Sequence, residues 1–147
     1  MIYTSRYSNP ELKSGRYTTV RISIGTPRWP LGYTLDAAIK ELMPFGIFGI
    51  EDKTLFKEKY FQRLNKPGTF EKIDLQLRDL SARGKDVVLL CYEDIRKGPS
   101  NWCHRNMFAE WWLHQTGEPI KELKDESRFT YEKGYSPKKE QKEIALF

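Results

Sequence analysis

The sequence predicts a single α/β domain with three layers, in which a mostly parallel sheet carries helices on both faces. The first observation is the run Val87-Val88-Leu89-Leu90-Cys91-Tyr92-Glu93, because a mostly apolar run between polar segments is typical of a strand buried on both faces. The second is that residues 69–84 before it and 102–116 after it have the apolar spacing of helices. The third is the length of 147 residues, which suits one domain with a sizeable core.

Two strands and one short helix are predicted ahead of this central unit. Residues 2–5 are β-prone and run into a polar, proline-containing loop. Residues 17–24 alternate apolar and polar side chains, as a strand with one better buried face does. Residues 34–42 combine a capping residue with helical spacing, so they are predicted to form a short helix that ends before Pro44.

Two longer helices and a last strand complete the predicted fold. Residues 54–64 place aromatic and aliphatic side chains at helical spacing, with lysines between them. A second helix is predicted to be capped by Thr69 and closed by Gly84. Residues 120–123 are predicted to form the final strand. We assign the apolar stripes of these helices to the core and no chemistry to them.

Residues 1–123 are predicted to form the domain, and residues 124–147 a polar C-terminal extension. This extension contains a Lys-rich run at 137–142 and ends in an apolar stretch at 144–147. It is expected to be partly solvated or to dock on the body or on a second subunit, so a homo-oligomer stays an alternative. The net charge of +5 permits a nucleic-acid partner without requiring one.

Composition predicts a cytoplasmic protein with no membrane partner. The sequence has no apolar stretch long enough to cross a membrane, and its first residues lack the basic start and apolar core of a signal peptide. Only two cysteines are present. In a reducing compartment they are expected to be free thiols or metal ligands rather than a structural disulfide.

A candidate site is predicted where the central strand ends and the next helix begins. Ser100 or Asn101 is the expected N-cap of that helix. The triplet Cys103, His104 and Arg105 then falls in its first turn. Ligands of open α/β sheets bind beyond the carboxyl ends of the strands, beside helix N-termini with free N–H groups. The triplet is therefore predicted to line such a crevice.

Four residues would carry the chemistry if the protein is an enzyme. Cys103 or Cys91 would be the nucleophile, because a helix N-terminus and nearby cations stabilise a thiolate. His104 or Glu93 would move protons. Neighbouring helix positions point about 100° apart. At least one of Cys103, His104 and Arg105 is therefore expected to be structural.

A metal site is an alternative use of the same side chains. Cys91, Cys103 and His104, with Glu93, include enough ligands for zinc, but their spacing lacks the paired C-x-x-C signature. We therefore predict neither a metal nor a cofactor. A simpler alternative makes Cys91 a small buried apolar residue.

Ligand contacts are predicted from loops that follow the strands. Arg28 and Trp29 lie between two prolines, which hold the backbone extended and present a cation beside an indole. The pair could stack on a base or hold a phosphate, or Trp29 could pack over a sheet edge while Arg28 is solvated. Ser5 and Arg6 follow the first strand and offer either an anion contact or a solvated turn. The full set of predicted ligand-binding residues is Ser5, Arg6, Arg28, Trp29, Tyr92 and Arg105.

These motifs resemble those of the domain-of-unknown-function 488 family. The segments that carry the resemblance are residues 84–93 with Cys91-Tyr92-Glu93, 102–105 with Cys103-His104-Arg105, 109–113, 3–5 and 23–29. The resemblance covers the chain from Met1 to about Leu123. It implies an α/β sandwich, and it implies no activity, because that family is named for its lack of an assigned function.

The leading functional hypothesis is binding of a phosphate-bearing nucleotide or nucleotide-derived small molecule at the carboxyl edge of the sheet, as in a sensor or a sequestering protein. One alternative is a thiol-dependent enzyme that acts on a nucleotide or nucleobase. Another is nucleic-acid binding, with phosphate contacts from the Lys-rich run. The sequence leaves open whether a bound ligand is turned over.

Overall fold

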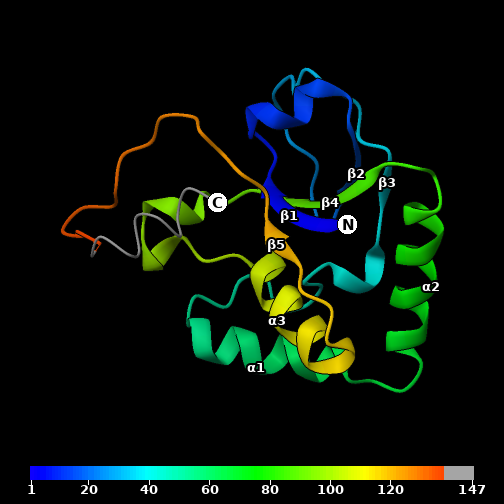
Figure 1. Ribbon diagram of the computed structural model, residues 1–147. Helices are drawn as coiled ribbons and strands as arrows, with labels where there is room; N and C mark the ends of the chain where they lie inside the picture. Colours follow the sequence, from blue (N-terminus) through cyan, green and yellow to red (C-terminus); the bar gives the residue numbers. More distant parts are fainter. Residues whose placement is uncertain (138–147) are drawn as a thin grey trace.

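A five-stranded, all-parallel sheet is the centre of the computed structural model, which describes residues 1–137 (Figure 1). Along the sheet the strands follow the order β3-β2-β4-β1-β5. The strands are β1 (Ile2–Arg6), β2 (Tyr17–Arg21), β3 (Ala37–Ala38), β4 (Asp86–Cys91) and β5 (Lys121–Glu122). The prediction of a single α/β domain with a parallel sheet is confirmed.

Strand β4 occupies the middle of the sheet, as its apolar sequence predicts. It pairs with β1 on one side and with β2 on the other, so that Leu90 lies opposite Ser5 and Arg21. Residues 87–91 are all buried. Because every strand runs in the same direction, the loops after Arg6, Arg21, Cys91 and Glu122 leave the sheet at one edge.

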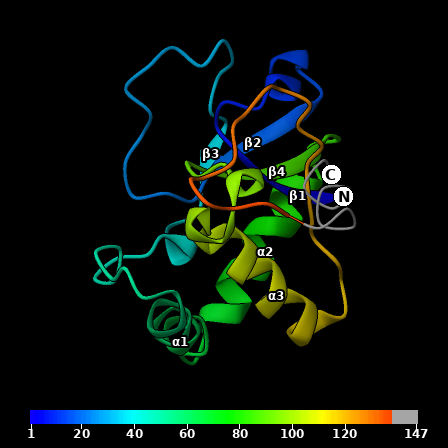
Figure 2. The ribbon, with the colours of Figure 1, turned by 90° about the vertical axis from the view of Figure 1, so that its left-hand side faces the viewer.

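The three α-helices pack against one face of the sheet, and a 3-10 helix with loops covers the other (Figures 1 and 2). The α-helices are α1 (Lys53–Leu64), α2 (Thr69–Ser81) and α3 (His104–Thr116). The 3-10 helices are η1 (Pro10–Ser14), η2 (Lys40–Leu42), η3 (Ile95–Lys97) and η4 (Pro99–Asn101). The alternation of side chains along β4 separates the two faces.

The core is accordingly divided in two. Val87 and Leu89 of β4 face a large cluster that includes Phe108 and Trp111 of α3. The opposite cluster consists of Tyr7, Leu12, Val88, Leu90 and Leu123, with tyrosines from β1, β2 and the 31–35 loop packed around it. Within residues 1–137 the second face is therefore covered by η1 and a loop, whereas the first carries all three α-helices, so the predicted three-layer arrangement with helices on both faces is not confirmed.

The helix predicted for residues 34–42 is wrong. The segment forms the edge strand β3 and then η2, because its backbone amides pair with the free edge of β2. The Asp36 amide donates to Thr19 O at 2.9 Å, and the Ile39 amide donates to Arg21 O at 3.1 Å. The strand predicted for residues 17–24 is also shorter than expected, since β2 ends at Arg21.

The first part of the C-terminal extension packs on the body. Buried Arg96 donates to the backbone oxygens of Asp125 and Ser127, at 2.8 and 2.7 Å. The carboxylate of Glu132 accepts from the Ser100 amide and the Asn101 side chain. Most of the predicted Lys-rich run and all of the apolar 144–147 stretch lie outside the described residues. Within residues 1–137, no helix is both long and apolar enough to span a membrane.

Candidate functional site

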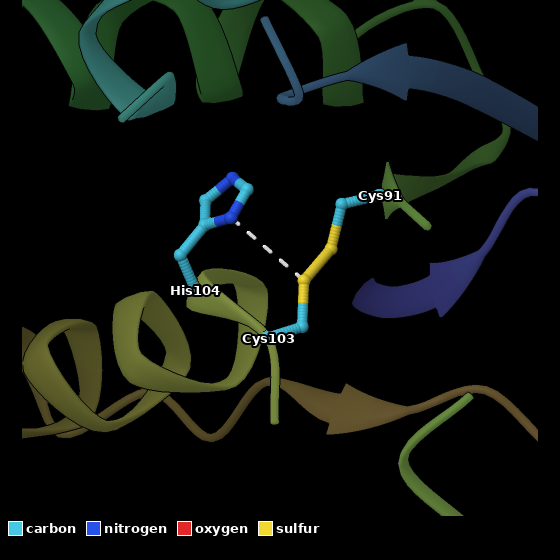
Figure 3. Close-up of side chains that lie close together, drawn as sticks. All are labelled: Cys91, Cys103 and His104. Atoms are coloured by element: carbon cyan, nitrogen blue, oxygen red, sulfur yellow. Dashed lines mark hydrogen bonds between the residues drawn. A yellow bond between two sulfur atoms is a disulfide. The ribbon is translucent and has the colours of Figure 1, made fainter. Parts of the chain in front are cut away.

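Cys91, Cys103 and His104 meet at the carboxyl edge of the sheet (Figure 3). Cys91 is the last residue of β4, Cys103 is the N-cap of α3 and His104 is the first residue of that helix. All three side chains are buried. The prediction that Ser100 or Asn101 is the N-cap is wrong, because both residues belong to η4 and the chain is extended at Trp102 before α3 starts. These three side chains therefore meet where the central strand ends and the next helix begins.

The two cysteines are joined in a disulfide, which corrects the expectation of free thiols or metal ligands. The two cysteines are twelve positions apart in the sequence, and the bond forms because the end of β4 and the start of α3 face each other. It closes the loop that contains η3 and η4. The nucleophile predicted at Cys91 or Cys103 is therefore present only after this bond is reduced.

His104 is held in one orientation by the end of β2. Its Nε2 lies 2.7 Å from the backbone oxygen of Ile22, and since a carbonyl oxygen can only accept, Nε2 carries the proton. The other ring nitrogen, Nδ1, lies 3.8 Å from Cys103 Sγ. Burial, assisted by the nearby Arg105 guanidinium, lowers the pKa of His104 to about 4. The imidazole is neutral at pH 7, with the lone pair of Nδ1 facing the sulfurs.

Arg105 is fully buried, and its guanidinium bridges three segments of the protein. Nη2 donates to Glu122 Oε2 at 2.7 Å and to Glu93 O at 2.8 Å, and Nη1 donates to Cys91 Sγ at 3.1 Å. A ligand anion would have to displace Glu122 to reach this group. The predicted ligand contact at Arg105 is therefore not supported by the geometry, which instead makes Arg105 the structural member of the triplet.

Arg6 and Ser5 are engaged in the same way. Arg6 Nε donates to Asp125 Oδ2 at 2.7 Å, and the same guanidinium lies 3.7 Å from Asp94 Oδ2. Asp94 is also paired with buried Arg96, which holds the pKa of that carboxyl below its usual value despite its partial burial. Buried Ser5 accepts a hydrogen bond from the Asn9 side chain and donates one to the backbone oxygen of Arg6. Both residues fasten the extension and the first loop to the sheet.

A cavity of about 520 Å³ opens above the cysteine pair. Its lining includes both cysteines, His104 and the predicted residues Tyr92 and Glu93. The remaining lining residues are Ser23, Ile24, Gly25, Pro44, Phe48, Ile50, Glu51, Phe56, Ser100 and Trp102. The cavity thus combines an apolar, aromatic wall with a few polar groups, which is typical of a small-molecule site.

Exposed aromatic side chains surround this cavity. Phe48 is 74% exposed and Tyr92 is 39% exposed, although both are large apolar rings. The ring of Tyr92 contacts Tyr7 and Trp29, with centroids 5.0 and 5.9 Å apart. Trp29 and Arg28 lie on the exposed 24–30 loop next to Tyr92, outside the lining itself. Trp29 therefore extends the aromatic surface through its contact with Tyr92.

A second cavity of about 690 Å³ shares Trp102 and Cys103 with the first. Lys53 and Lys57 line it, but Lys57 is paired with Glu110. Its walls come from α1, the segment with η3 and η4, α3, β5 and the C-terminal extension. Sequence reasoning did not single out this cavity.

Several lining residues were not predicted as site residues. Ser23 and Gly25 follow β2, and the topology of a parallel sheet could have indicated them, because they leave the same edge as Cys91. Phe48 and Phe56 carried no such signal, since aromatic residues near helices are most often core. The chain matches no protein-family model, no curated protein and no solved structure. The resemblance to the domain-of-unknown-function 488 family therefore stays a prediction.

Proposed function

We propose that this protein binds a small molecule with a planar, nucleobase-like ring in the cavity above the Cys91–Cys103 pair. The observation that carries the proposal is the wall of that cavity, which Tyr92, Phe48 and Trp102 line from three different segments. Flat rings stack on such side chains whatever their exact substituents. In the unbound protein the rings of Phe48 and Tyr92 expose apolar surface to water, which is unfavourable. A bound ring would cover that surface.

A phosphate on the ligand would be bound mainly by Arg28. Of the three arginines predicted to bind an anion, Arg6 and Arg105 are paired with carboxylates, whereas Arg28 is exposed. It precedes Trp29, whose ring contacts Tyr92 at the cavity rim. The ring therefore supplies most of the affinity in this proposal, and the phosphate adds a salt-dependent contact.

Calorimetric titration with AMP, GMP, CMP and UMP, and with the four matching nucleosides, tests this proposal. We expect saturable binding of at least one base, weakened at least tenfold in Tyr92→Ala and unchanged in the control Tyr131→Ala. The control is matched because Tyr131 is 36% exposed, close to the 39% of Tyr92, but lies on the C-terminal extension outside the lining. No binding of any compound, or equal loss in both variants, would remove the support for this function.

Thiol-dependent chemistry is the second candidate, and the contact between Arg105 and Cys91 favours it. In the reduced protein, a guanidinium 3.1 Å from Sγ would stabilise the Cys91 thiolate, and Cys103 would lie at the N-terminus of α3. Both sulfurs line the cavity. The low pKa of His104 makes its Nδ1 a weak base toward Cys103, whereas the exposed Glu93 carboxylate could serve a ligand at the rim.

Iodoacetamide labelling of the reduced protein, followed by mass spectrometry, tests this candidate. We expect one cysteine of the folded protein to be labelled faster at pH 7 than the same cysteine in protein unfolded in urea. Unfolded thiols have their ordinary pKa of about 8.5. Labelling of both cysteines more slowly than in urea would contradict a nucleophilic role. Nucleic-acid binding stays a prediction, because its Lys-rich run lies almost wholly outside the described residues.

A further inference from the structure

We propose that the reduced Cys91–Cys103 pair and His104 form a zinc site with three protein ligands and a fourth position that opens into the cavity. This inference does not depend on the identity of the organic ligand. It rests on the placement of three donor atoms, on the hydrogen bond that orients the imidazole and on the space above the sulfurs.

The donor atoms are already gathered. One ligand atom each from Cys91, Cys103 and His104 lies within 4.8 Å of the other two, and all three residues are buried. Two thiolates and an imidazole are ligands that Zn²⁺ prefers. The residues come from the end of β4 and the start of α3, so the sheet and the helix fix their relative positions.

The hydrogen bond of His104 has the arrangement that is common among metal-binding histidines. Ligating imidazoles commonly donate their second ring N–H to a carboxylate or a backbone carbonyl, which fixes the tautomer and the ring plane. Here Nε2 donates to Ile22 O at 2.7 Å, so that Nδ1 keeps its lone pair. Figure 3 shows this ring edge turned toward the two sulfurs, with Nδ1 joined by the dashed line to Cys103 Sγ at 3.8 Å.

The backbone spacing of the cysteines suits a shared metal ion. Their Cα atoms lie 7.3 Å apart. Most disulfides span roughly 4.4–6.8 Å between Cα atoms. In a tetrahedral site with Zn–S bonds of about 2.3 Å, the two sulfurs are about 3.8 Å apart. Once the bond between them is reduced, the two side chains can separate to that distance by rotation.

Conversion to the metal site needs a reductant, which we take to be a dithiol. It transfers two electrons and two protons to the Cys91–Cys103 bond, yielding two thiols while the dithiol becomes a disulfide. Zn²⁺ then replaces both thiol protons, which are released to solvent. The two thiolates balance the charge of the ion, and Arg105, itself paired with Glu122, still donates to Cys91 Sγ as an outer hydrogen bond.

The fourth position would face the cavity, because all three ligand residues line it. Three protein ligands with one open position are typical of catalytic rather than structural zinc, since water or a ligand atom can complete the tetrahedron. Glu93 and Ser23 line the same cavity, and the Ser23 hydroxyl is hydrogen-bonded to Tyr7 and to the backbone oxygen of Gly25. A zinc-bound pair would be a ligand set rather than a nucleophile, which separates this role from thiol catalysis.

Cobalt titration of the reduced, desalted protein tests the site. We expect one equivalent of Co²⁺ to produce a thiolate charge-transfer band and the d–d bands of tetrahedral coordination, and Zn²⁺ to displace it. Protein kept oxidised should give neither band. The control is His114→Ala, because His114 is the other histidine of the chain and lies exposed near the end of the same helix. This variant should titrate like the wild type.

Variants of the ligands should lose the site. Cys91→Ser is expected to abolish the charge-transfer intensity of one thiolate, and His104→Ala to weaken Co²⁺ binding at least tenfold. Reduced wild-type protein that gives no cobalt bands would overturn the proposal, whatever the folding of the variants. Wild-type affinity in both Cys91→Ser and His104→Ala would overturn it as well. Nucleotide binding in metal-free protein is measured separately, so either proposal can fail alone.

Discussion

Neighbouring residues at the start of α3 have different tasks because they point in different directions. His104 turns to the end of β2 and the sulfurs, whereas Arg105 turns to β5 and bridges Glu122. The geometry of a helix predicts that the triplet cannot converge on one atom. Which member is structural could not be predicted, because Glu122 and the Ile22 carbonyl reach the site from distant parts of the sequence.

Replacement of Arg105 by Met should destabilise the protein by about 3 kcal/mol, because it leaves Glu122 unpaired in a largely buried position. Urea unfolding measures the change. The matched control is Arg78→Met, since the Arg78–Asp74 pair joins neighbouring turns of α2 and the Arg78 side chain is 73% exposed. It should cost less than about 0.5 kcal/mol. Similar losses in both variants would mean that the Arg105 bridge adds no stability.

Stability should fall on acidification through the titration of His104. Its pKa is lowered to about 4, mainly by burial, whereas an unfolded histidine titrates at the ordinary 6.5. As the pH falls, the unfolded state therefore binds the proton before the folded state does. A contribution of about 3 kcal/mol to the free energy of unfolding, fully present above pH 6.5, is lost as the pH falls toward 4. Urea unfolding at several pH values should show this loss in wild type and His114→Ala. A His104→Asn variant with the same slope would contradict it.

At the scale of elements, the sequence predicted the strands and helices whose apolar pattern lies within their own residues. The apolar run of β4 and the stripes of α1, α2 and α3 identify these elements, because each buries one continuous set of side chains. Residues 34–42 show the limit of such reasoning. Their helical spacing is overridden by the unpaired edge of β2, a partner that no local pattern reveals. The disulfide was missed for a related reason, since the compartment argument outweighed the proximity of the two motifs.

Reduction of the Cys91–Cys103 bond should lower the unfolding free energy by about 3 kcal/mol, because the bond closes a short loop and restricts the unfolded chain. Urea unfolding with and without reductant in metal-free buffer measures this difference. The double variant Cys91→Ser/Cys103→Ser is the control and should not respond to reductant. Equal stability of oxidised and reduced wild type would contradict the prediction.

At the scale of the molecule, the parallel topology brings distant loops to one edge, which is why the sequence could point to this edge as the place of a candidate site before its geometry was known. Which residues are available to a ligand at this site could not be predicted in full. The ion pairs among Arg6, Asp94, Arg96 and Asp125 engage Arg6, which the sequence predicted to be available for a ligand. They are spread over the chain and are recognised only in three dimensions. The same network attaches the start of the C-terminal extension to the body.

A Gly98→Ala substitution should loosen that attachment. An added Cβ would lie 2.5 Å from Glu132 Cδ, and Gly98 has a φ of +152°. We expect a loss of about 1–3 kcal/mol and faster trypsin cleavage after Arg128 and Lys133. The control Gly117→Ala has a similarly unfavourable φ of +76° but nothing within 4 Å of the added atom. Equal cleavage of both variants would mean that contact with Glu132 does not hold the extension.

The central claim is that the cavity above Cys91, Cys103 and His104 is where this protein binds its ligand. The most direct test is a two-dimensional NMR titration of ¹⁵N-labelled protein with the four nucleoside monophosphates. The account predicts saturable shifts concentrated in the backbone amides of residues 23–25, 92–93 and 102–104, which line that cavity. Saturable shifts centred on η1 or α2, or no shifts with any of the four compounds, would contradict it.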